Sequence, residues 1–298
     1  MREGVLWTNL SRAAIADELG KHGFHVSVPV VAQLLERHHL GRRKAQKSLP
    51  LKRHAQRDQQ FQIITRLRAE YENSPNPIFS VDTKHKEFLG QLFRAGRLYT
   101  QKPLQAFDHD FPSSATGVLY PHGIYDCKRN LGHINIGLSH DTSRFACDSI
   151  AYYWNNHGRA AFPNASSIMM LCDGGGSNAA SRYIFKYYLE LLAELLGVEI
   201  RVAHYPPYCS KYNPIEHRFF PHVTRACQGL LFSSLDVVRE AMANASTSTG
   251  LATTVNVIPG DYPIGEKAPK GYKKTTKILF AEELPAWNYR AVPAKWVS

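Results

Sequence analysis

The sequence predicts an α/β fold in which helices cover a mixed sheet, with a separate helical region at the amino terminus. Short apolar runs come first and are followed by alternating strand and helix patterns, an order typical of such a sheet. A cluster of Asn, Ser and Pro at residues 73–77 separates this part from the helical patterns before it. The 298 residues, 44% of them hydrophobic, are enough for one large domain and a small one.

The amino-terminal part, residues 8–40, predicts two short helices. Ser11 and Ser27 are candidate N-caps, and Pro29 suits the first turn of the second helix. Two compact helices joined through glycine are typical of a helix-turn-helix, and an ordinary helical hairpin fits the pattern equally well. We therefore expect a helix-turn-helix DNA-binding region at residues 1–45.

A basic segment follows these helices. No acidic residue occurs between Arg37 and Arg57. Cationic side chains after a helical pair suit contacts with DNA phosphates, although a solvated linker would have the same composition. The candidates for DNA contact in this segment are Arg42, Arg43, Lys44, Lys47, Lys52 and Arg53.

The remaining elements follow from apolar spacing. Residues 58–72 predict a helix, and with the basic segment they form an expected linker at residues 46–76. The main domain, residues 77–230, is expected to contain strands and helices in a fixed order. These are strand 78–82, strand 116–125, strand 132–138, helix 143–155, strand 167–173, helix 182–196, strand 198–205 and helix 214–227. Residues 231–298 predict an irregular carboxyl-terminal extension.

Three carboxylates stand out by their positions. Asp82 and Asp173 each end an apolar strand, at the sheet edge where α/β proteins bind ligands, and Glu216 lies one turn into a helix. If they converge, their charges repel, and hard divalent cations such as Mg²⁺ remove that cost. Two such ions about 3.5–4 Å apart can clamp the oxygens of a phosphoryl displacement. The alternative metal-binding acids are Asp126, Asp141 and Asp148.

Four further side chains near these acids are candidates for DNA contact. Lys84 follows Asp82 by two residues, and Lys211, Tyr212 and Arg218 flank Glu216. Charge and aromatic stacking suit a nucleic-acid strand. The alternatives are an ordinary exposed lysine and a loop that only fixes the start of the helix.

Composition limits the partners. The net charge of +11 and a pI of about 9.4 favour a polyanionic partner such as nucleic acid, although a basic enzyme without one would show the same charge. No apolar run is long enough for a transmembrane helix, and the start lacks a secretory signal. The five cysteines include no C-x-x-C pair, so we expect a reducing cytoplasm.

Five motifs in order resemble the DDE transposases of the Rhodopirellula transposase family. The resemblance extends from about residue 10 to residue 272. The motifs are Val81-Asp-Thr-Lys84, Tyr120-Pro-His-Gly-Ile-Tyr-Asp126, His140-Asp-Thr142, Asp173-Gly-Gly-Gly-Ser-Asn178 and Lys211-Tyr-Asn-Pro-Ile-Glu-His-Arg218. The sequence departs from the family pattern in three ways. Tyr208-Cys209 replaces a usual Gly-Thr pair, Tyr212 replaces a usual Trp, and the amino terminus looks short, as if truncated.

The resemblance implies a ribonuclease-H-like core behind a helix-turn-helix, and a DDE-type polynucleotidyl transferase. Asp82, Asp173 and Glu216 match its catalytic acids. It also implies cutting and joining of insertion-sequence ends with two Mg²⁺ ions, or Mn²⁺ in their place. Double-stranded DNA is the expected partner, bound by a homo-oligomer on paired ends, in the bacterial cytoplasm at the nucleoid. A catalytically decayed DNA-binding protein and a nuclease of the same fold that never joins ends are the alternatives.

Overall fold

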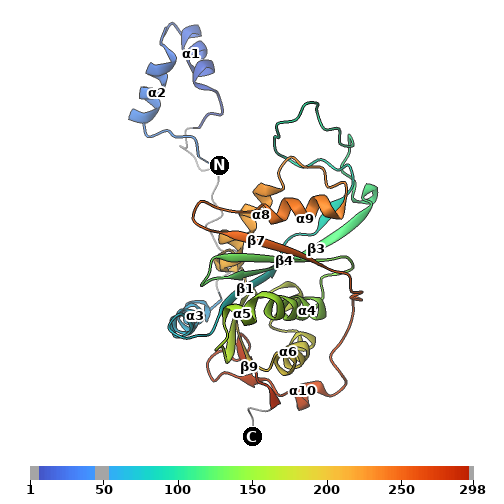
Figure 1. The fold of residues 1–298 in the computed structure, drawn as a ribbon. Coiled ribbons are helices and arrows are strands. Elements are labelled where there is room, and N and C mark those ends of the chain that lie inside the picture. Colours follow the sequence, from blue (N-terminus) through green and yellow to red (C-terminus); the bar gives the residue numbers. More distant parts are fainter. Residues whose placement is uncertain (1–6, 44–53, 295–298) are drawn as a thin grey trace. The chain divides into compact units, whose positions relative to one another are not determined.

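The computed structural model describes residues 7–43 and 54–294, and the chain divides into two compact units after Pro50. The first contains α1 (Arg12–Lys21) and α2 (Val28–Arg37), at the two predicted places (Figure 1). The Ser11 hydroxyl caps α1 by accepting a hydrogen bond from the Ala14 N–H at 3.1 Å. Ser27 stands at the N-cap of α2, but its side chain makes no capping bond. A helix-turn-helix role for this pair stays a prediction.

The second unit is built on one mixed sheet. The strands of the described residues are β1 (Ile78–Thr83), β2 (Glu87–Leu89), β3 (Gly117–Asp126), β4 (Leu131–Gly137), β5 (Ser167–Cys172), β6 (Glu199–His204), β7 (Ala252–Ile258), β8 (Leu279–Phe280) and β9 (Asn288–Ala291). Their order is β7-β4-β3-β1-β5-β6-β9-β8, and β2 pairs with β3. β1, β5 and β6 are parallel, whereas β3 runs antiparallel to both β1 and β4. The predicted mixed sheet is confirmed.

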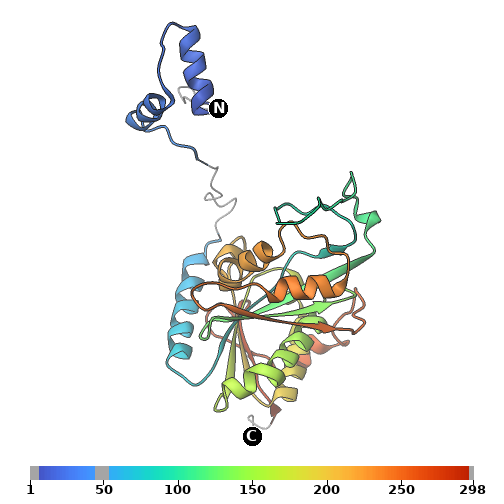
Figure 2. The same cartoon turned by 45° about the horizontal axis from the view of Figure 1, so that its top comes forward.

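Helices cover both faces of this sheet (Figures 1 and 2). They are α3 (Arg57–Glu72), α4 (Ser143–Tyr153), α5 (Arg159–Ala161), α6 (Tyr183–Leu196), α7 (Pro214–Arg218), α8 (Phe220–Ala226), α9 (Leu235–Ala243) and α10 (Tyr272–Thr275), with 3-10 turns at Pro112–Ser114, Gly176–Asn178 and Ser210–Tyr212 and a π turn at Trp154–Gly158. Residues of α4 and α6 share one core with the sheet. Residues of α3 and of α7 to α9 form two further cores with the opposite face. No helix in the described ranges is long and apolar enough to cross a membrane.

Two parts of the chain pack more closely than the sequence predicts. The helix expected within a linker, α3, belongs to the unit of the sheet, because Ile63, Ile64 and Leu67 are buried against its strands. The expected irregular extension adds β7 to one edge of the sheet and β8 and β9 to the other. Its strands escape prediction because they are short or only partly buried, so apolar alternation is weak.

The helix predicted at residues 214–227 is broken into α7 and α8. Phe219 leaves the helical conformation between them, with φ −127° and ψ −61°. Pro221 has no N–H to donate to the preceding turn, so a continuous helix would lose a hydrogen bond there. The break leaves Glu216 on a helix of five residues, and this helix needs anchors outside itself.

Candidate active site

The site begins at the carboxyl ends of two neighbouring strands. β1 and β5 are parallel, and their register pairs Val81 with Cys172. Asp82 and Asp173 each follow the paired residue, so they emerge side by side at one edge of the sheet. This edge is where α/β sheets bind ligands.

A cavity of about 500 Å³ opens at this edge. Asp82, Asp173 and Glu216, all three acids singled out by the sequence, line it. Asp141, weighed only as an alternative, lines it as well. Thr83, Lys84 and Ser177 also form part of its wall.

Glu216 reaches the cavity because a buried hydrogen-bond set fastens α7 to β1. The Ser80 hydroxyl donates to Asn213 Oδ1 at 2.5 Å and accepts from the Ile215 N–H at 2.9 Å. Asn213 Nδ2 in turn donates to the Val81 carbonyl at 3.4 Å. Ser80 and Asn213 are both fully buried. This pair is not predictable from the sequence, where its only signal is a serine within an apolar strand.

The loop after Asp173 is held at both ends. The Gly175 N–H donates to Asp173 Oδ1 at 3.0 Å, and His204 Nδ1 lies 2.8 Å from the Asp173 carbonyl oxygen. Burial lowers the pKa of His204 to about 4, so the ring is neutral near pH 7 and Nδ1 carries the proton that this carbonyl accepts. The Ser143 hydroxyl donates to the Ser177 carbonyl at 2.7 Å and ties the loop to α4.

The three alternative acids are not equivalent. Asp141 accepts a hydrogen bond from the Thr83 hydroxyl at 3.0 Å, within the cavity. Asp126 is the last residue of β3, where it pairs with Phe79 of β1. Its side chain accepts hydrogen bonds from the N–H groups of Lys128 and Arg129, so it caps a turn. Asp148 on α4 accepts from the Tyr262 hydroxyl at 3.0 Å. The geometry therefore separates Asp126 and Asp148 from the cavity.

The acidic side chains in the cavity repel one another. Burial, the negative charge of Asp173 and the neighbouring Glu216 raise the pKa of Asp82 to about 9. Across residues 7–43 and 54–294, no three His, Cys, Asp or Glu side chains already form a compact metal-binding group. The donors are nevertheless all carboxylate oxygens, the ligands that Mg²⁺ prefers, and a cation would relieve the repulsion. The residues present thus fit a hard divalent ion.

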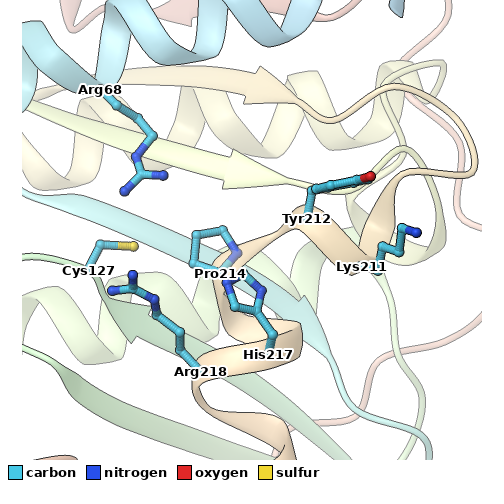
Figure 3. Close-up of a pocket in the computed structure, with 7 residues that line it drawn as sticks. All are labelled: Arg68, Cys127, Lys211, Tyr212, Pro214, His217 and Arg218. Carbon is cyan, nitrogen blue, oxygen red and sulfur yellow. The ribbon is translucent and has the colours of Figure 1, made fainter. Parts of the chain in front are cut away.

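The predicted DNA-contacting residues fall in several places. Lys84 lies in the cavity wall, where its ammonium pairs with buried Glu87. Lys211, Tyr212 and Arg218 line a different cavity, and Glu216 is not part of its wall (Figure 3). Residues two apart on a helix do not share a face, so Arg218 and Glu216 point to different sides of α7. In the amino-terminal unit Arg42 and Arg43 are exposed. Lys44, Lys47, Lys52 and Arg53 lie outside the described residues.

Comparison with known proteins identifies the family. The family described as the Rhodopirellula transposase DDE domain matches residues 1–293. The chain belongs to this family. It is therefore a DDE-type polynucleotidyl transferase, and its fold is a mixed sheet with flanking helices.

Solved structures similar to this family member include complexes of the Mos1 transposase. One is a Mos1 paired-end complex with the left transposon end, at 13% identity and a TM-score of 0.46, covering 80% of this chain and 72% of that one. Another is a Mos1 mariner paired-end complex with Mg, at 14% identity and a TM-score of 0.46, with the same coverage. No curated protein matches the chain significantly.

Proposed function

We propose that this protein is a DNA transposase that cuts insertion-sequence ends and joins them to target DNA, with Asp82, Asp173 and Glu216 as its catalytic and metal-binding acids. The observation that carries the proposal is that these side chains line one cavity at the ends of two parallel strands. Family membership and the net charge of +11 support a reaction on DNA.

The chain's own residues would position the reacting groups. Divalent ions bound by the three acids would neutralise charge on the attacking and leaving oxygens. Asp82 is oriented by the Thr83 N–H, which donates to its Oδ1 at 2.8 Å. In the first step water attacks a DNA phosphodiester, forming one P–O bond and breaking another to release a 3′-hydroxyl. In the second step that hydroxyl attacks target DNA in the same way.

The test is an Asp82→Asn variant, with Asp148→Asn as its control. Asn keeps the volume of Asp82 but removes the negative charge that binds a cation, so cleavage of DNA carrying the element ends in Mg²⁺ or Mn²⁺ should fall at least about 10³-fold. DNA binding in EDTA should persist. Asp148 lies outside the cavity and its amide can still accept from Tyr262, so the control should cleave like the parent. Equal cleavage by the parent and Asp82→Asn would refute the metal assignment.

Labelled ends separate this function from its alternatives. A transposase gives strand-transfer products with target DNA, whereas a nuclease of the same fold gives only hydrolysed ends. A decayed enzyme gives neither, in any divalent ion. The proposal includes double-stranded DNA as partner, assembly of a homo-oligomer on paired ends, and work at the nucleoid in the bacterial cytoplasm.

A further inference from the structure

The short helix α7 separates two cavities of opposite character. Glu216 lines the acidic cavity, whereas the next two residues, His217 and Arg218, line a second cavity of about 410 Å³. The remaining wall of the second cavity comes from Arg68 of α3, the turn at Lys211 and Tyr212, Pro214 and the Cys127 thiol. Figure 3 shows the guanidinium groups of Arg68 and Arg218 pointing toward each other, with the thiol between them.

The second cavity is lined by positive charge without a matching acid. Arg68, Lys211 and Arg218 contribute three basic side chains, and no Asp or Glu is part of the wall. Within the described residues none of the three forms an ion pair. By contrast, Arg66, two residues before Arg68 on the same helix, pairs with Glu283 at 2.9 Å. Two convergent guanidinium groups are well suited to a phosphate, which accepts several charged hydrogen bonds at once.

The groups around the two arginines do not supply the missing charge. Burial raises the pKa of the Cys127 thiol to about 12, so the thiol is neutral near pH 7 even beside two guanidinium groups. Asp126, its chain neighbour, is not part of the wall and pairs instead with Arg129 at 3.9 Å. Glu72 lines an adjoining cavity and not this one. An anion from outside would therefore meet an attractive field.

The adjoining cavity adds an aromatic surface. It measures about 360 Å³ and shares Arg68 and Tyr212 with the basic one. The Tyr212 side chain is 42% exposed at the boundary between the two, and the Lys211 ammonium lies 5.2 Å from its ring centroid. Cations that hold a phosphate beside an aromatic ring that can stack on a base are typical of surfaces that bind a nucleic-acid strand.

We propose that Arg68 and Arg218, assisted by Lys211, bind a backbone phosphate of DNA on the side of α7 opposite Glu216, with Tyr212 against the adjacent nucleotide. The proposal rests on the proposed function, because its ligand is the same DNA. It adds a second contact point, which would fix the direction in which a strand leaves the acidic cavity.

The test compares Arg68→Gln/Arg218→Gln with the control Arg66→Gln/Arg239→Gln. Both pairs remove two positive charges, but Arg66 and Arg239 are exposed and paired with surface acids. Binding of duplex DNA is measured at several NaCl concentrations in EDTA, so that an inactive enzyme still gives a readout. We expect roughly tenfold weaker binding for the first pair, and a log–log salt slope reduced by about one. The control should stay close to the parent.

Two outcomes would overturn the proposal. One is an equal loss in both pairs, which would reflect net charge alone. The other is unchanged DNA binding in Arg68→Gln/Arg218→Gln. If inorganic phosphate then raises the melting temperature of the parent but not of this variant, the cavity binds a free anion and not DNA. Arg218→Gln alone, at an exposed position, keeps the test valid if the double variant folds poorly. Failure of metal-dependent cleavage affects neither measurement.

Discussion

The position of Glu216, a candidate catalytic residue, depends on the small side chain of Ser80. Its hydroxyl is bonded to both Asn213 and the Ile215 N–H, and all three groups are buried. A serine in an apolar strand gives no sign of this role in the sequence, because its partners lie more than 130 residues further along the chain. The sequence singles out Asp82 and Asp173 at strand ends and Glu216 one turn into a helix, but it does not show the anchors that bring Glu216 to the same cavity.

We predict that Ser80→Ala uncouples α7 from β1. Two buried polar groups lose their partner, so the free energy of unfolding should fall by about 1–3 kcal/mol. A shift of Glu216 by about 1 Å should slow DNA cleavage on the order of 10²-fold. Urea unfolding and an end-cleavage assay measure the two effects.

The control for this variant is Ser167→Ala. Ser167 is also buried, and its hydroxyl bonds to Tyr71 at the opposite end of the parallel strands from the cavity. It should lose stability and keep its cleavage rate. A Ser80→Ala enzyme that cleaves normally would show that α7 is positioned by other contacts.

At the scale of elements, α7 and α8 can pack closely on β3 only because residue 123 is glycine. Gly123 pairs with Asp82 across the sheet, and an added Cβ would lie 2.5 Å from the Phe220 ring and 2.9 Å from Ile215. Apolar spacing predicts the strands and the outer helices, but it cannot show such a close approach between distant elements. It also misses the break at Phe219, which follows from Pro221 and the packing of this ring.

We predict that Gly123→Ala displaces α7 and α8 together. Overpacking should lower the free energy of unfolding by about 1–3 kcal/mol, and cleavage should fall more than DNA binding because Glu216 moves with α7. The matched variant is Gly117→Ala on the same strand, where the new methyl would contact only the Leu89 side chain, whose nearest atom, Cδ1, lies at 3.2 Å. Denaturant unfolding and cleavage rates of the two variants would decide, and equal effects would contradict the argument.

At the scale of the molecule, the two units have unequal cores. The three hydrophobic cores begin at Ile63 and lie entirely in the second unit, whereas Val31 is the one buried apolar side chain described in residues 7–43. The sequence places a boundary at residues 73–77 because prolines break the chain there. The physical boundary comes earlier, because the apolar face of α3 needs the sheet to cover it.

We therefore predict that residues 51–298 fold without the rest of the chain. Their thermal unfolding should remain cooperative, with the midpoint of the full-length protein, since every core side chain is retained. DNA affinity should fall, because residues 1–50 carry eight Lys and Arg against four acids. Calorimetry of both proteins, with DNA titrations at one salt concentration, measures the two quantities. A clearly lower midpoint for the fragment would mean that the amino-terminal helices stabilise the sheet, and undiminished affinity would place the DNA contacts wholly in the second unit.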